Sequence, residues 1–122
     1  MKITTAESLL MDVLWRDSPL EADEITARVA DQGWSRTTVR TLLARLVQKG
    51  VVEQRKAPGQ KDLFVPLVER SEYTHAESRN LVDRLFGGKV SPLFAQFAER
   101  AELSDEDIAE LKALIERIED GR

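Results

Sequence analysis

The residues of this chain best suited to chemistry are arginines and threonines that recur at helical spacing within residues 34–50. At about 100° per residue, the apolar side chains of that segment fall on one face of a helix. The opposite face carries Thr37, Arg40 and Thr41, and Arg36 lies in the first turn. Arginine donates two hydrogen bonds to guanine, and threonine offers a base edge both a hydroxyl and a methyl group. This face is therefore predicted to enter the major groove of DNA.

The ends of this helix are marked by residue types that cap helices. Ser35 is a suitable N-cap and Gly50 suits a left-handed C-terminal residue, so the helix is predicted to span 36–49. Capped surface helices with arginines are common in proteins that never touch nucleic acid. The interpretation therefore depends on the flanking segments.

Those flanking segments predict a winged helix. A capping box at Thr4 opens a helix to about residue 16, and a second helix over 21–31 leads through a short turn into the helix over 36–49. Residues 51–55 and 61–65 then alternate as strands around a turn, which indicates a hairpin. Arg55, Lys56 and Lys61 are expected near the tip of this wing, where they reach phosphate or the minor groove. The competing interpretation is a solvated loop.

Charge is unevenly distributed along the 122 residues, whose net charge is -4. Residues 34–61 hold seven basic side chains against the single acid Glu53: Arg36, Arg40, Arg45, Lys49, Arg55, Lys56 and Lys61. The remainder is strongly acidic. A basic footprint on one face suffices for affinity to phosphate, while acidic surface elsewhere limits indiscriminate binding.

From residue 71 the sequence is helical throughout, with predicted helices over 71–86 and 91–100 and a last one after Ser104. Its apolar residues exceed what about fifty residues can bury alone, so two copies are expected to cover each other rather than each tail folding back. The predicted dimerisation residues are Leu81, Leu85, Phe94, Phe97, Ile108, Leu111, Ile115 and Ile118. The chain is thus predicted to be mainly α with a small β-hairpin wing, comprising a winged helix-turn-helix domain (1–70) and a helical dimerisation domain (71–122).

Other chemistry is thinly represented. There is no cysteine, and His75 is the single histidine, so neither a thiolate metal site nor a nucleophile with its base is indicated. The carboxylates of residues 104–110 are expected to be helix-start charges. No catalytic residue, metal site or cofactor is predicted, and the chain is not expected to be an enzyme. It has no basic-then-apolar leader and no apolar run that could span a bilayer, so a cytoplasmic protein without direct membrane association is expected.

Over nearly its whole length the sequence resembles the penicillinase repressors, the BlaI/MecI family. The matching marks are Ala6-Glu7, Val13-Leu14-Trp15, Trp34-Ser35, Thr38-Val39-Arg40-Thr41-Leu42-Leu43-x-Arg45-Leu46, Lys49-Gly50, Ser71-Glu72-Tyr73, Phe86-Gly87-Gly88 and Leu103-Ser104-x-x-Asp107-Ile108-x-Glu110-Leu111. The resemblance implies a homodimeric winged-helix repressor of a palindromic operator, with groove contacts at Thr38, Arg40 and Thr41. The chain departs from the family at Arg36-Thr37, where relatives usually carry proline and lysine, so a different half-site is expected.

The resemblance also implies a release mechanism and a setting in antibiotic resistance. In characterised relatives a membrane-bound zinc protease senses beta-lactams, and the repressor is inactivated by cleavage between asparagine and phenylalanine. The matching bond here is Gln96–Phe97. Because glutamine is one methylene longer than asparagine, release by a different inducer is an alternative. Copper-responsive relatives use C-terminal cysteines, which this chain lacks.

Two alternative functions remain at this point. One is a winged-helix regulator that binds a small ligand directly, although nothing in the sequence marks its pocket. The other is a protein-interaction adaptor, which would not need Arg40 and Thr41 on an exposed face.

Overall fold

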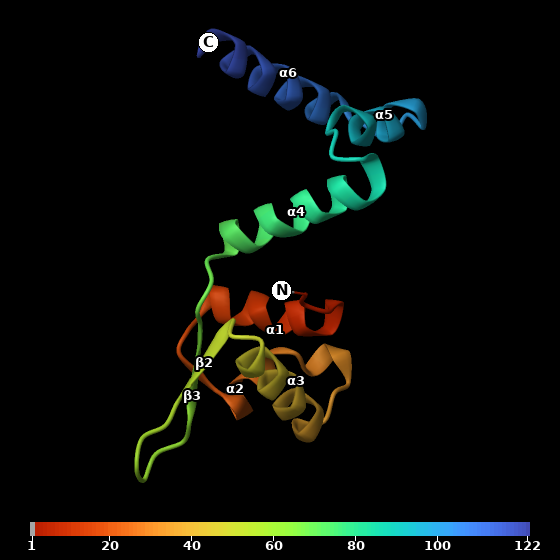
Figure 1. Ribbon diagram of the computed structural model, residues 1–122. Helices are drawn as coiled ribbons and strands as arrows, with labels where there is room; N and C mark the ends of the chain where they lie inside the picture. The colour runs from red at the N-terminus through yellow and green to blue at the C-terminus, as the bar shows by residue number, and fades with distance from the viewer. Residues whose placement is uncertain (1) are drawn as a thin grey trace. The chain divides into compact units, whose positions relative to one another are not determined.

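The computed structural model describes residues 2–122, which divide into two compact units, the first ending at Thr74 and the second running from His75 to Arg122 (Figure 1). The elements of the first unit are α1 (Thr5–Arg16), β1 (Leu20–Glu21), α2 (Ala22–Arg28), the 3-10 turn η1 (Ala30–Gln32), α3 (Arg36–Gln48), β2 (Val52–Arg55) and β3 (Leu63–Pro66). α4 (Arg70–Phe86) begins in the first unit and ends in the second, which also contains α5 (Ser91–Glu99) and α6 (Asp105–Asp120). The predicted mainly α fold with a small wing is confirmed.

The core of the first unit lies among α1, α2, α3 and the sheet. Its fully buried apolar side chains include Leu10, Met11, Leu14, Ile25, Val39, Leu43, Leu46, Val51 and Val52. Burial of one such side chain stabilises the fold by about 1.5–3 kcal/mol, so this cluster supplies the main driving force for folding the unit. The capping box predicted for α1 is confirmed, because the amide of Glu7 donates to Thr4 Oγ1 at 3.1 Å and the amide of Thr4 donates to Glu7 Oε1 at 2.8 Å.

The second helix is shorter than the predicted span of 21–31. α2 ends at Arg28, and Val29 leaves helical geometry at φ −110° and ψ 23° with its side chain buried in the core. A single 3-10 turn follows and ends at Gly33, whose φ of 71° is left-handed. The chain turns early because burying Val29 and reversing at Gly33 bring α3 against the core.

The predicted hairpin is confirmed, and a third strand joins it. β2 and β3 are antiparallel, with Glu53 opposite Val65 and Arg55 opposite Leu63. β1 pairs with the other edge of β3, so the strand order is β1-β3-β2. β1 could not be predicted from the sequence, because two residues are too few to show an alternating pattern. This strand anchors the start of α2 beside the first residues of β3.

A buried ion pair joins α1 to the end of α3. The side chain of Glu7 has no exposed surface, and its Oε1 accepts a hydrogen bond from Lys49 Nζ at 2.5 Å. Burial raises the pKa of Glu7, but the hydrogen bonds from Lys49 and Thr4 outweigh it, so the pKa lies below its ordinary value. Lys49 Nζ also donates to the carbonyl of Lys2 at 2.7 Å. Lys49 therefore stabilises the fold and does not contribute to the basic footprint predicted from the sequence.

Trp15 fastens the start of α4 to α1 within the first unit. Its Nε1 donates to the carbonyl of Val68 at 2.9 Å, and its ring lies 5.3 Å from that of Tyr73. The guanidinium of Arg70 lies 5.2 Å from the same ring, within the range of a cation–π contact. Trp15 is thus a packing residue of this unit.

The second unit consists of the end of α4 with α5 and α6. α4 ends at Phe86 and is followed by Gly87 and Gly88, both with positive φ. Ser104 caps α6 through a capping box with Asp107. α5 begins at Ser91, with Val90 at the N-cap position and Pro92 as the second residue of the helix. Large apolar side chains are exposed here, namely Leu81, Leu85, Val90, Phe94, Phe97, Ile108, Leu114, Ile115 and Ile118. Among residues 2–122, no helix is long and apolar enough to cross a membrane.

We expect Glu7→Gln to lower the free energy of unfolding by about 1–3 kcal/mol at neutral pH, because Lys49 loses its charged partner. The folded-state pKa of Glu7 lies below its ordinary value of 4.5. Its stabilisation is therefore fully present above that value and is lost as the pH falls through the lowered one. Urea unfolding followed by circular dichroism between pH 7 and pH 3 measures the difference between variant and parent.

The matched control for this measurement is Glu72→Gln, since Glu72 is exposed and makes no ion pair within the described residues. It should leave the stability nearly unchanged at every pH. A Glu7→Gln deficit that persisted undiminished at pH 3 would contradict the assigned role of the charge.

Candidate nucleic-acid interface

α3 presents one buried face and one exposed polar face, as its periodicity predicted. Val39, Leu42, Leu43 and Leu46 are buried. The exposed side chains include five of the predicted DNA-binding residues, Thr37, Thr38, Arg40, Thr41 and Arg45. Ser35 caps the helix as predicted, with Oγ accepting from the amide of Thr38 at 3.1 Å, and Gly50 has the expected left-handed φ of 79°.

The threonine hydroxyls of α3 are already oriented by hydrogen bonds of the helix itself. Thr41 Oγ1 donates to the carbonyl of Thr37 at 3.0 Å, and Thr38 Oγ1 lies 3.1 Å from Ser35 Oγ. Because the proton of Thr41 is engaged, its hydroxyl meets an outside group as an acceptor. An acceptor at this position suits the amino groups that adenine and cytosine expose in the major groove.

Arg40 connects the exposed face of α3 with the wing. It lines a surface pocket together with Gln54, Gln60, Lys61 and Phe64 from the wing and with Glu21–Asp23 at the start of α2. Within residues 2–122, Arg40, Arg45 and Lys56 make no hydrogen bond or ion pair. These three cations are therefore available to an outside anion or base edge.

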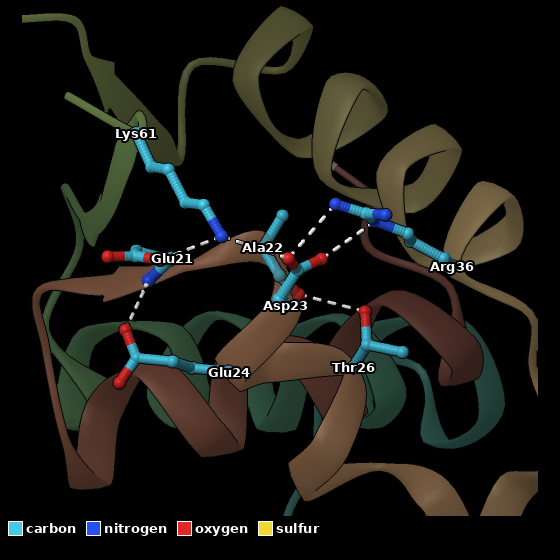
Figure 2. A network of polar contacts seen from close by, with 7 residues as sticks. All are labelled: Glu21, Ala22, Asp23, Glu24, Thr26, Arg36 and Lys61. Atoms are coloured by element: carbon cyan, nitrogen blue, oxygen red, sulfur yellow. Dashed lines mark hydrogen bonds and ion pairs between the residues drawn. The ribbon is translucent and has the colours of Figure 1, made fainter. Parts of the chain in front are cut away.

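The other basic side chains of segment 34–61 are held by carboxylates. Arg36 forms a bidentate contact with Asp23, from Nε to Oδ1 at 2.7 Å and from Nη2 to Oδ2 at 2.9 Å (Figure 2). Lys61 Nζ lies 3.4 Å from Asp23 Oδ2 and 3.9 Å from Glu21 Oε2. Arg55 Nε donates to Glu53 Oε1 at 2.6 Å. The positive charge of the segment is thus partly neutralised in the free protein.

Apart from Glu53, the carboxylates that hold these cations were not predicted from the sequence. Glu7, Glu21 and Asp23 lie outside segment 34–61, so its charge count did not include them. In the sequence, Asp23 looks like an acid placed near the start of a helix, where such residues are common. Only the fold reveals that Asp23 lies between α3 and the wing. Among residues 2–122, no three carboxylates or histidines are arranged to hold a metal ion.

Comparison with known proteins places this architecture in a family. Residues 3–117 match the model of the penicillinase repressors. The chain belongs to the penicillinase repressor family. It is 29% identical over 116 residues to the penicillinase repressor of Bacillus licheniformis, covering 94% of this chain and 90% of that protein. It is 30% identical over 117 residues to the methicillin resistance regulatory protein MecI of Staphylococcus aureus strain N315, covering 95% of this chain and 94% of that protein.

Solved structures of the repressor BlaI match about three fifths of the chain. The DNA-binding domain of the repressor BlaI aligns with a TM-score of 0.52 at 30% identity, covering 59% of this chain and 88% of that one. Monomeric BlaI of Bacillus licheniformis in complex with the blaP half-operator has the same TM-score and identity, covering 60% of this chain and 89% of that one. The multiple antibiotic resistance repressor MarR, at 18% identity and a TM-score of 0.51, shares the fold alone.

We expect Ser35→Ala to lower the free energy of unfolding by about 1 kcal/mol, because the amide of Thr38 at the start of α3 loses its acceptor. Thermal unfolding followed by circular dichroism measures this loss. The exposed Ser78→Ala, within α4, is the control and should not lower the melting temperature, because alanine favours the helix more than serine does. Equal melting temperatures for Ser35→Ala and the parent would show that the cap does not hold the helix.

Proposed function

We propose that this protein is a transcriptional repressor that binds a palindromic operator as a homodimer, with α3 in the major groove and the wing on the DNA backbone. The observation that carries the proposal is the exposed polar face of α3, on which unpaired Arg40 lies beside the wing. Family membership supports it, as do relatives that are named penicillinase repressor and methicillin resistance regulator. The half-operator complex of the similar BlaI supports DNA as the partner.

In this proposal the residues divide between reading bases and holding phosphates. Arg40 donates two hydrogen bonds to a guanine, and Thr37, Thr38 and Thr41 contact neighbouring base edges. Arg45 and Lys56, which have no carboxylate partner, neutralise phosphates and fix the register of the protein on the duplex. Such a protein is a cytoplasmic regulator rather than an enzyme, and the names of its relatives favour control of beta-lactam resistance genes.

We expect Arg40→Ala to weaken binding to the preferred site by about 1–3 kcal/mol and to relax base preference at one position of each half-site. Selection from a random duplex pool, followed by fluorescence anisotropy at several salt concentrations, measures both effects. Lys56→Ala is the comparison variant. It should weaken binding to all sequences alike and reduce the salt slope by about one.

This measurement also separates the repressor from the alternatives. A protein-interaction adaptor would select no sequence, and Arg40→Ala would change nothing in any DNA assay. Wild-type binding that depends on salt but shows no preferred site would reduce the protein to a nonspecific DNA binder.

The second unit supplies the proposed dimer interface. On α6 the side chains of Ile108, Leu111, Ile115 and Ile118 follow a 3-4-3 spacing along one face, and Ile115 and Ile118 are 55% and 60% exposed. A cleft between α5 and α6 is lined by Phe94, Phe97, Leu103, Leu111 and Leu114. An apolar surface of this extent in water favours burial against a second copy. Two linked recognition helices then bind two half-sites together.

We expect Ile115→Glu to convert the dimer to a monomer, because the carboxylate would be buried without a partner at the interface. Sedimentation equilibrium measures the change, and circular dichroism should show the helix content retained. Ala113→Glu is the matched control, since Ala113 lies on the opposite face of α6 and receives the same charge. If Ile115→Glu stayed dimeric, the interface would have to lie elsewhere.

Release of the repressor is proposed to follow the mode that the family resemblance implies, cleavage at Gln96–Phe97 by a membrane zinc protease that senses the inducer. Both side chains are exposed in α5. A protease needs extended backbone, and α5 is only nine residues long with no side-chain cap at its start, so local opening costs little. Cleavage there would separate α6 from the rest of the chain and remove part of the proposed interface.

A further inference from the structure

We infer that Asp23 is a specificity-determining residue, which lowers the affinity for arbitrary DNA by holding Arg36 and Lys61 in the free protein. The inference rests on the proposed function. It concerns a carboxylate that makes no base contact itself but controls two cations at the edges of the proposed interface.

The geometry places one carboxylate between the two DNA-facing elements. Arg36 approaches Asp23 from the first turn of α3, and Lys61 approaches it from the segment before β3, as Figure 2 shows. The guanidinium makes a two-bond fork with both carboxylate oxygens at 2.7 and 2.9 Å. A phosphate group offers arginine the same planar pair of acceptors. Asp23 therefore engages the donors of Arg36 that a phosphate would otherwise bind.

These contacts are accessible and exchangeable. The side chains of Arg36 and Lys61 are 59% and 66% exposed, and that of Asp23 is 38% exposed. Ion pairs with this exposure are screened by water and contribute little to folding stability. A well-placed phosphate can therefore displace the carboxylate, and the fold does not depend on the pair. The ion pair of Glu7 with Lys49 is different in kind, because Glu7 is fully buried.

Two types of complex should respond differently to this competition. A loosely docked complex on arbitrary sequence gains almost all its affinity from cations on phosphates, and its phosphates compete poorly with a carboxylate already in place. A complex in register on the operator is held by Arg40 as well, which makes no hydrogen bond or ion pair with Asp23. Its phosphates remain positioned against Arg36 and Lys61 long enough to replace the carboxylate. Asp23 thus penalises arbitrary DNA more than the operator.

The test uses the full-length protein and the variant Asp23→Asn, which keeps the size of the side chain but removes its charge. The probes are a duplex selected by the wild-type protein and a scrambled duplex of the same composition, measured by anisotropy between roughly 0.05 and 0.2 M KCl. At about 0.1 M salt each released cation that binds a phosphate adds about 0.9 to the salt slope and about eightfold in affinity. We expect the variant's affinity for the scrambled duplex to exceed that of the wild type by about tenfold or more, with a steeper salt slope. Its affinity for the selected duplex should rise less than about fivefold.

The matched control is Glu24→Gln, which removes the same charge one residue along the helix. Glu24 contacts neither cation, and its Oε1 accepts from the amide of Glu21 at 2.9 Å, a bond that the amide oxygen of glutamine preserves. This variant should change the affinity for scrambled duplex by less than about twofold. An equal gain in both variants would assign the effect to net charge and overturn the inference.

A double-mutant cycle tests the mechanism. Arg36→Gln should alter scrambled-duplex affinity little in the wild-type background, where Asp23 already holds the guanidinium, and should remove much of the gain in the Asp23→Asn background. Purely additive effects would overturn the inference. So would weaker binding by Asp23→Asn to both duplexes, since Asp23 would then be positioning Arg36 for contact.

The outcomes keep the inference and the proposed function apart. If the wild-type protein selects no sequence but Asp23→Asn still raises scrambled-duplex affinity through Arg36, the operator-specific repressor fails while the restraint on nonspecific binding remains. If the wild-type protein selects a site and Asp23→Asn changes neither duplex, the inference alone fails. Absence of DNA binding by the wild-type protein overturns both.

Discussion

A fully buried carboxylate must keep its cationic partner, and in the first unit that partner marks the end of the helix proposed to read DNA. Glu7 accepts from Lys49, the residue directly after α3, so that the end of α3 is tied to the start of α1. Ser35 caps the other end, and the apolar face between them lies in the core. α3 therefore has little freedom to roll or slide. Its exposed face is presented in one orientation before any ligand arrives, which reduces the ordering cost of binding.

Pairing with carboxylates also reduces the number of cations in segment 34–61 that are available to DNA. Lys49 is engaged in the fold, Arg55 pairs with Glu53, and Arg36 and Lys61 share Asp23. The field that DNA would meet comes chiefly from Arg40, Arg45 and Lys56, which have no carboxylate partner among the described residues. With fewer unpaired cations, phosphate contacts supply less of the affinity for DNA, so base contacts carry a larger share of it. Each surrounding carboxylate then has a larger effect on the affinity for DNA.

The features predicted from sequence are those that depend on near neighbours. The cap at Ser35, the box of Thr4 with Glu7 and the left-handed Gly50 each involve residues within a few positions, so their residue types suffice. The features that were missed join residues far apart. Glu7 and Lys49 are separated by 42 positions, and Asp23 and Lys61 by 38. No local pattern distinguishes Asp23 from any other acid near a helix start, so its place between α3 and the wing emerges only when the chain is folded.

The short strand β1 explains why these distant charges meet. Its register places Leu20 opposite Phe64 and Glu21 opposite Leu63, with Leu20 and Phe64 both buried. Because α2 begins directly after Glu21, this pairing fixes the first turn of α2, and with it Asp23, beside Lys61 in the loop between β2 and β3. α2 also packs on α3, which brings Arg36 to the other side of the same carboxylate. The pairing of this two-residue strand thus places Asp23 where it can bind both Arg36 of α3 and Lys61 of the wing.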